Sequence, residues 1–182
     1  MGSPFNSATS RDFLRPRAIY SSRVSANQFH IMTTEELKFG FDIVFTVTDY
    51  QDGPRKGIAN YRGEPHFYEC IFNDARDGYS DSFRLTPLDT ELFQLAMEDW
   101  EIWRRWETAF HSQKTDRSTH PALPREANRH AELKRTIDRL LVTDPRKVFV
   151  KVGRFEVLGT STLPKSAPQR LQVEWTEPPP DA

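Results

Sequence analysis

The residue best placed for acid–base chemistry is His66, which follows Pro65 where a turn is predicted to lead into a strand. There its ring would lie near Asp49 or Asp52 of the preceding hairpin, and Glu69 follows on the same strand. A histidine–carboxylate pair can transfer protons near neutral pH. The sequence places no nucleophile or oxyanion donor beside it. We therefore favour a role in pinning the turn and keep a small acid–base enzyme as the alternative.

The single cysteine, Cys70, lies on the same predicted strand as His66. Their side chains share a face, but the spacing corresponds to about 13 Å along a strand, too far for a hydrogen-bonded nucleophile and base. We interpret Cys70 as a buried, unreactive thiol. One cysteine excludes an internal disulfide framework and a four-cysteine zinc site, and it favours a cytoplasmic protein.

Two glutamate–histidine pairs have the spacing that puts both members on one face of a helix. Glu107 and His111 lie on the first predicted helix, and Glu126 and His130 lie on the second. Facing helices can build carboxylate–histidine metal centres, but the usual spacing is one residue shorter and draws glutamates from further helices. We expect no metal and no cofactor, and keep these four residues as an alternative metal site.

Three of the four tryptophans, Trp100, Trp103 and Trp106, fall within one predicted helix. At about 100° per residue, their rings cannot share one narrow face. Trp103 and Trp106 lie on the stripe expected to face the core. Trp100 groups instead with Phe93 and Met97 on a second stripe beside it.

Aromatic residues, methionine and arginine are enriched at protein interfaces. We therefore predict that Phe93, Met97, Trp100 and Arg104 contact a protein partner or a second copy of the chain. Acidic residues surround Arg104 and Arg105, which favours ion pairs along the helix over stacking on nucleic-acid bases.

Composition argues against several other partners. A net charge of −1 gives no electrostatic attraction for nucleic acid or an anionic membrane. No apolar run approaches the roughly 18 residues of a membrane span. The glycine- and lysine-containing segment 53–57 joins two predicted strands and opens no helix, so it lacks the geometry of a phosphate-binding loop.

Turn signals and period-two alternation predict an antiparallel series of strands. They cover residues 39–48, 56–61, 66–72, 82–85, 147–152, 155–158 and 171–175. In the first strand, five residues are expected to share the buried face: Phe39, Phe41, Ile43, Phe45 and Val47. Gly153 is expected to kink or turn the chain late in the sequence.

Helical periodicity replaces alternation after the fourth strand. Thr86 is the expected N-cap of the first helix, which should end near residues 111–113, and a second helix is predicted over 125–141 with Leu140 facing inward. The fold predicted is α+β: an antiparallel β-meander of about six strands, forming a twisted sheet or small partly open barrel. An αα-hairpin is inserted after the fourth strand.

The expected domain organisation has three parts. Residues 1–32 carry four arginines and one acid among many Ser and Asn residues, which is typical of a disordered, leader-like or non-native segment. Residues 33–177 form one α+β domain, and residues 178–182 form a proline-rich tail. The sequence thus predicts a soluble, non-enzymatic interaction or regulatory module that uses the aromatic helix flank and the β-hairpin loop tips.

Overall fold

The computed structural model describes residues 37–50, 52–75, 77–141, 145–158 and 170–179. The chain divides into two units, Met1–Met32 and Thr33–Ala182, of which only the second contains described residues. The prediction for residues 1–32 lies outside the described residues, as does most of the tail at 178–182. All the elements that follow belong to the second unit.

Six antiparallel strands form a closed barrel in sequence order. They are β1 Asp42–Tyr50, β2 Pro54–Tyr61, β3 Glu64–Asn73, β4 Gly78–Pro87, β5 Phe149–Val157 and β6 Leu171–Thr176. The barrel closes where β1 pairs with β6, with Asp42 opposite Val173 and Ile43 opposite Gln172. The α+β class and the meander are confirmed, whereas the open sheet or partly open barrel was wrong. Closure depends on the pairing of the first strand with the last, which no local pattern contains.

Strand β1 does not follow the alternation expected for it. Its pairing with β2 is irregular between Val44 and Thr46 and again beyond Val47, as at β-bulges. Val44 is in the core and Val47 packs against it. The Thr46 hydroxyl is buried and accepts a hydrogen bond from the amide of Ile58 at 2.9 Å. Phe45 meets a helix instead, and Phe39 precedes the strand and is fully exposed, so the predicted single buried face was wrong.

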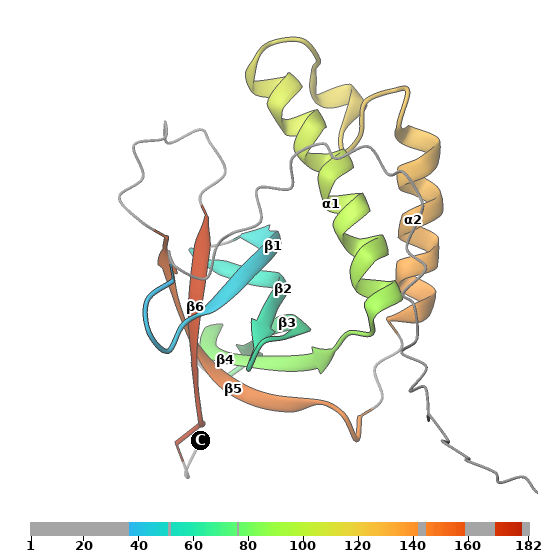
Figure 1. The fold of residues 1–182 in the computed structure, drawn as a ribbon. Coiled ribbons are helices and arrows are strands. Elements are labelled where there is room, and N and C mark those ends of the chain that lie inside the picture. The colour runs from blue at the N-terminus through green and yellow to red at the C-terminus, as the bar shows by residue number, and fades with distance from the viewer. Residues whose placement is uncertain (1–36, 51, 76, 142–144, 159–169, 180–182) are drawn as a thin grey trace, which may run out of the picture. The chain divides into compact units, whose positions relative to one another are not determined.

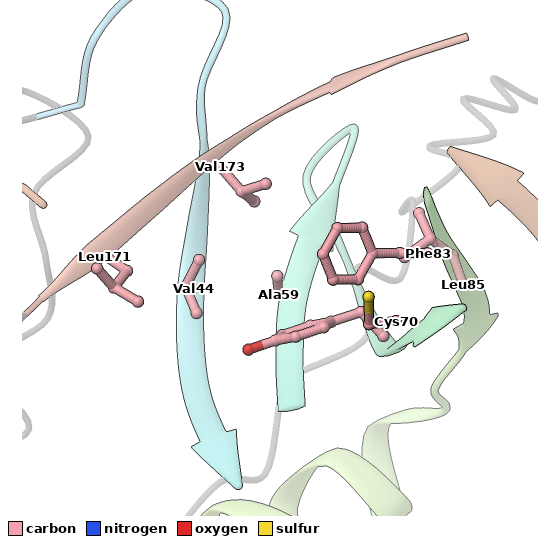
Figure 2. Close-up of a cluster of buried hydrophobic side chains, with 8 residues drawn as sticks. Val44, Ala59, Cys70, Phe83, Leu85, Leu171 and Val173 are labelled. Carbon is pink, nitrogen blue, oxygen red and sulfur yellow. The ribbon is translucent and has the colours of Figure 1, made fainter. Parts of the chain in front are cut away.

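The barrel core is a cluster of buried side chains contributed by five of the strands, and partly buried Phe149 and Phe155 of β5 pack against it (Figure 2). The buried members are Val44, Ala59, Tyr68, Cys70, Phe83, Leu85, Leu171 and Val173. Ring contacts at 5.3–5.9 Å link Phe83 with Tyr68, Phe155 and Trp175. This aromatic packing fills the small barrel, as expected where few strands close on themselves.

Two glycines are required by close packing inside the barrel. A Cβ at Gly57 would lie 2.1 Å from the carbonyl oxygen of Thr46 and 2.7 Å from the hydroxyl of Tyr68. A Cβ at Gly153 would lie 2.6 Å from the Trp175 ring. Strand β5 continues through Gly153 without interruption, so no turn occurs there, and the glycine makes room for tryptophan.

Helix α1 spans Thr90–His111 and ends where the sequence predicts. It begins later than predicted, because Asp89 is the N-cap and its carboxylate accepts from the Leu92 amide at 2.8 Å. Thr86 belongs to β4, where Pro87 pairs with His66. The capping signal at Thr86 was therefore overridden by strand pairing.

Helix α2 spans Ala127–Leu140 and follows a short 3-10 turn, η2 Arg117–Thr119 (Figure 1). The two α-helices share a core of their own, made of Ile102, Ala122 and Leu133 with Leu95 and Ile137 packed around them. Leu140 is 40% exposed, so its predicted inward orientation was wrong. Insertion of the helical hairpin after the fourth strand is confirmed. Within the described ranges, no helix has the length and apolar character needed to cross a membrane.

Candidate functional site

An open groove of about 710 Å³ lies between the C-terminal half of α1 and the chain that connects α1 to α2. We call it the α1 groove. Its lining is Glu101, Arg104, Arg105, Thr108, Ala109, Ser112, Lys114, Leu123, Pro124 and Arg125. The α1 members recur every three or four residues, so they share one side of the helix. Four of the lining residues are cationic and one is acidic, which gives the groove a positive character.

Little of this positive charge is neutralised locally. Arg105 donates to the carboxylate of Glu126 at 2.7 Å, while Arg125 approaches the same carboxylate only to 3.9 Å and is 75% exposed. Lys114 is exposed, and its only hydrogen bond among those of the described residues is the one its amide donates to the Ala109 carbonyl. Exposed cations without close counter-charges remain available to a negatively charged ligand.

Arg104 lies on the wall of the groove with a buried Nε atom that has no hydrogen-bond partner among the described residues. Glu107, one turn further along α1, has a buried Oε2 atom that also lacks a hydrogen-bond partner among the described residues. Burial raises the pKa of the Glu107 carboxyl, and the nearby charge of Arg104 partly offsets this effect. Unpaired buried polar atoms are rare in proteins and call for an explanation.

The four predicted partner-binding residues have different surroundings in the structure. The Phe93 ring packs edge-on against Phe45 of β1 at 5.0 Å, so it helps to attach α1 to the barrel. Trp100 stacks on Trp103 with ring centroids 4.6 Å apart, and both rings are partly buried, as is Met97. Arg104 lines the α1 groove. The four residues therefore form a strip that begins at the barrel contact and ends at the groove.

Trp103 and Trp106, expected on one core stripe, have different surroundings. Trp106 is buried and its indole N–H donates to the Thr119 hydroxyl at 3.0 Å. It also stacks on Phe110 and contacts His120 edge-on. Trp103 instead pairs with Trp100 on the flank of α1. We call the stacked pair Trp100–Trp103 the tryptophan flank.

A second exposed aromatic group lies at the end of the barrel where β1 and β3 end and β2 and β4 begin. Tyr50 is 66% exposed, Phe72 is 45% exposed and Tyr79 is 40% exposed. Phe72 and Tyr79 make an edge-to-face contact at 5.2 Å, and the Arg55 guanidinium lies over the Tyr79 ring at 4.5 Å. These side chains belong to the predicted β-hairpin loop tips.

His66 is buried at the other end of the barrel rather than exposed on a rim. Its Nδ1 atom lies 2.8 Å from the Glu64 carbonyl oxygen, which makes Nδ1–H the donor in that bond. The rings of Tyr61 and Phe149 contact the imidazole edge-on at 5.7 and 5.6 Å. The ring is thus held by a backbone acceptor and two aromatic neighbours.

The carboxylates proposed to partner His66 lie elsewhere on the barrel. Asp49 pairs across the strands with Lys56, which in turn pairs with Glu69, whose carboxylate lies 2.8 Å from the Lys56 ammonium. His66 is three residues from Glu69 along β3, about 10 Å. Asp52 follows β1 beyond Asp49 and bends the chain with a positive φ of 51°. The structure does not bring these residues together with His66.

Lys151 is a buried cation near His66 that the sequence analysis did not single out. Its side chain is 9% exposed and forms an ion pair with Glu177. The ammonium also lies over the rings of Tyr61 and Phe149, at 5.4 and 5.7 Å. Hydrogen bonds to the Glu177 carboxylate and to Tyr61 raise the pKa of Lys151. A lysine among β-branched residues on a predicted strand was the available signal, since such a position is rarely charged without a partner.

Cys70 is buried in the barrel core, and its thiol lies 3.0 Å from the Ser80 carbonyl oxygen. The Arg55 guanidinium donates towards the sulfur at 3.7 Å. Burial raises the pKa of the thiol, although Arg55 acts in the opposite direction. A raised pKa reduces the thiolate fraction that nucleophilic chemistry requires.

The four residues of the alternative metal site make separate contacts. His130 is paired with Asp99 at 2.7 Å and Glu126 with Arg105, while Glu107 and His111 remain on α1. Across the part of the chain that the structure describes, no group of three or more metal-binding side chains is present.

Comparison with known proteins finds no family model, no curated protein and no solved structure that matches this chain.

Proposed function

We propose that this chain is a non-enzymatic interaction module in which the barrel is a scaffold and the α1–α2 hairpin binds a protein partner. The observation that carries the proposal is the α1 groove, which has an open volume of about 710 Å³ and is lined by exposed cations without close counter-charges. A partner would give these cations the counter-charges that the described residues do not supply.

The form of α1 supports this role. A helix of 22 residues is about 33 Å long. Near its start, Phe93 contacts the barrel, and along one side it packs on α2 through Ile102. The groove and the tryptophan flank leave two neighbouring surfaces of the same helix for a partner. Tryptophan and arginine together are typical of the residues that contribute most to binding at interfaces.

The loop-tip aromatics provide a second, smaller surface for contact. Three aromatic rings are exposed there, those of Tyr50, Phe72 and Tyr79, although a scaffold does not require exposed rings. Tyrosine is favoured at interfaces because it combines an apolar ring with a hydroxyl group. We assign these residues a supporting role, because the α1 groove lies on the helical hairpin and not beside them.

The enzyme alternative has less support. His66 is held by the Glu64 carbonyl and two rings, and the candidate carboxylates lie elsewhere on the barrel. Cys70 has a raised pKa inside the core. Neither residue meets a nucleophile–base geometry.

The test is affinity capture with the full chain and a substitution that fills the groove. Thr108 is exposed and lines the groove, so Thr108→Tyr would block it without disturbing a core. Asn128→Tyr is the matched control, because Asn128 is exposed on α2 outside the groove lining. We expect a stoichiometric partner that wild type and Asn128→Tyr retain and Thr108→Tyr loses.

Two other outcomes are informative. Retention by Thr108→Tyr with loss in a Trp100→Ala variant would move the binding surface to the tryptophan flank. If Thr108→Tyr and Trp100→Ala both retain the partner and only Phe72→Ala or Tyr79→Ala loses it, binding by the helical hairpin is contradicted. Circular dichroism of each variant would verify that it is folded.

A further inference from the structure

The charge and shape of the α1 groove indicate what kind of segment it binds. Building on the proposed function, we propose that the α1 groove binds an extended acidic segment of a partner protein, whose carboxylates pair with Arg104, Lys114 and Arg125 while apolar side chains lie over Ala109 and Leu123.

The first argument is electrostatic. Arg104, Lys114 and Arg125 have no close carboxylate partner among the described residues, apart from the 3.9 Å approach of Arg125 to Glu126. They come from α1 and from the connection that follows it, so they border the groove on both sides. Like-charged groups gathered around one groove repel each other until an opposite charge enters.

The second argument is hydrogen bonding. The buried Nε atom of Arg104 is a donor without a partner among the described residues. A carboxylate accepts from a guanidinium in a planar, two-point arrangement that a neutral acceptor does not match. Glu107 lies outside the groove lining, and its attraction to Arg104 only partly offsets the burial that raises its pKa.

The third argument concerns the apolar groups in the lining. Ala109, Leu123 and Pro124 lie among the cations, and their presence favours a peptide with interspersed apolar residues over a small inorganic anion. Arginine and lysine stems add apolar surface beneath their charged ends. A protein segment of mixed acidic and apolar composition matches both parts of the groove.

Charge also argues against one occupant from the chain itself. Residues 1–32 carry four arginines and one acid, which is the same sign as the groove. Such a segment would be repelled, so we assign the groove to a partner of opposite charge. Occupation by residues 1–32 or by a second copy of the chain is an outcome that the experiment below can identify.

The first experiment measures binding of two fluorescein-labelled peptides to the full chain by anisotropy. One peptide alternates glutamate with leucine, and the other has lysine in place of each glutamate. We expect the acidic peptide to bind and the basic one not to bind. Affinity should fall several-fold as salt rises from about 0.05 M to about 0.3 M, because exposed charge pairs are screened.

Charge-reversal variants locate the interaction. Lys114→Glu and Arg125→Glu should each weaken binding of the acidic peptide by about tenfold, as for truncated charge pairs at interfaces. The same variants should gain affinity for the basic peptide, an effect that simple loss of structure cannot produce. Lys147→Glu is the control: the residue is exposed near β5 and outside the groove lining, so its effect should stay within about twofold, as expected of distant screened charges. Equal binding of both peptides, or equal effects of the groove and control variants, would overturn the inference.

A photo-cross-linking amino acid at Ser112, which is exposed in the groove, separates this inference from the proposed function. The full chain is irradiated in its native cells, and mass spectrometry identifies the attached segment. An acid-rich segment of another protein supports both proposals. A partner segment without net negative charge keeps the interaction module and overturns the acidic occupant. Attachment to residues 1–32 or to a second copy overturns the occupant as well, and the absence of any cross-linked protein counts against both proposals.

Discussion

The barrel and the helical hairpin are stabilised in different ways. In the barrel, every strand pairs with two neighbours, and Tyr68, Phe83, Phe155 and Trp175 pack ring against ring inside it. The hairpin has a small core around Ile102, Ala122 and Leu133, and its two helices are also joined by ion pairs at the surface. Buried aromatic area contributes far more to stability than exposed ion pairs do.

This difference separates the tasks of the two regions. A closed barrel has no free edge at which another strand could add, because every strand is already hydrogen-bonded to a neighbour on each side. The hairpin is less fully packed and keeps an open groove with unpaired charges. Regions with fewer buried contacts open at lower free energy, which is where binding surfaces are commonly found.

The largest expected effect comes from the barrel core. Phe83 is 3% exposed and meets three aromatic rings, so Phe83→Ala should lower the free energy of unfolding by about 3–5 kcal/mol. Urea titration followed by circular dichroism measures the change. Phe72→Ala is the matched control and should cost under about 1 kcal/mol, because the ring is exposed on the loop tip. Equal losses would contradict the contrast between core and surface rings.

The next effect tests whether the hairpin opens separately. Leu133 is 1% exposed in the hairpin core, so Leu133→Ala should destabilise the hairpin by about 2–5 kcal/mol. Hydrogen exchange should speed up at amides of α1 and α2 while amides of β2 and β3 stay protected. Leu140→Ala on the same helix should have little effect, since Leu140 is 40% exposed. Loss of protection across the barrel as well would show that the two regions unfold together.

A smaller effect with a pH signature concerns an ion pair between the helices. Arg129 donates twice to the Glu98 carboxylate at 2.7 Å, and this bond lowers the pKa of Glu98. A lowered carboxyl pKa means that the pair stabilises the fold above the ordinary glutamate pKa and stops doing so as pH falls through the lowered value. At neutral pH, Arg129→Ala should therefore lower the free energy of unfolding by roughly a quarter or less of the Leu133→Ala effect, as for exposed pairs. In acid, the difference in stability between this variant and wild type should vanish. Urea titrations at neutral and acidic pH measure the difference, with Asn128→Ala as the control.

The smallest effect has the opposite sign and concerns Glu107, which lies on α1 one turn after Arg104. Burial raises the pKa of Glu107, so ionisation of this carboxyl costs stability as pH rises through the raised value. Glu107→Gln should slightly stabilise the fold at neutral pH, and the gain should disappear below the ordinary glutamate pKa, where the carboxyl is protonated in both states. The same substitution removes a negative charge near Arg104 and should tighten binding of the acidic peptide.

The comparison for this last variant is Glu101→Gln, which removes a carboxylate from the groove lining itself. It should tighten binding of the acidic peptide in the same direction. A loss of stability for Glu107→Gln at neutral pH would show that the attraction between Glu107 and Arg104 outweighs the cost of burial.

Local signals predicted much of the fold. Gly63 adopts a positive φ of 82° in the turn between β2 and β3, as glycine readily does, and α1 ends where its periodicity ends. Turns and helix periodicity depend on residues close together in the chain, so a sequence expresses them directly. The N-cap at Asp89 was missed because Thr86 is also a residue type that favours the N-cap position. In the structure, Thr86 pairs with β3 as part of β4, and Asp89 caps the helix instead.

The candidate site was only partly predictable. Arg104 and Trp100 were identified by their residue types and spacing, and one lies in the groove while the other lies on the flank beside it. Lys114, Leu123 and Arg125 were missed, because they reach the groove through the path of the connection between the helices. His66 was identified, but its surroundings depend on which strands meet at that end of the barrel.

The sequence by itself determined the class of the fold, the order of its strands and helices, and the residues able to form an aromatic helix. Alternation, periodicity and turn chemistry are local properties, and they are complete within a few residues. The tertiary structure alone decided that β1 pairs with β6 to close the barrel, that Phe45 faces α1, and that four cations line one groove. These outcomes depend on contacts between residues far apart in the chain, whose free energy appears only when strands and helices pack together.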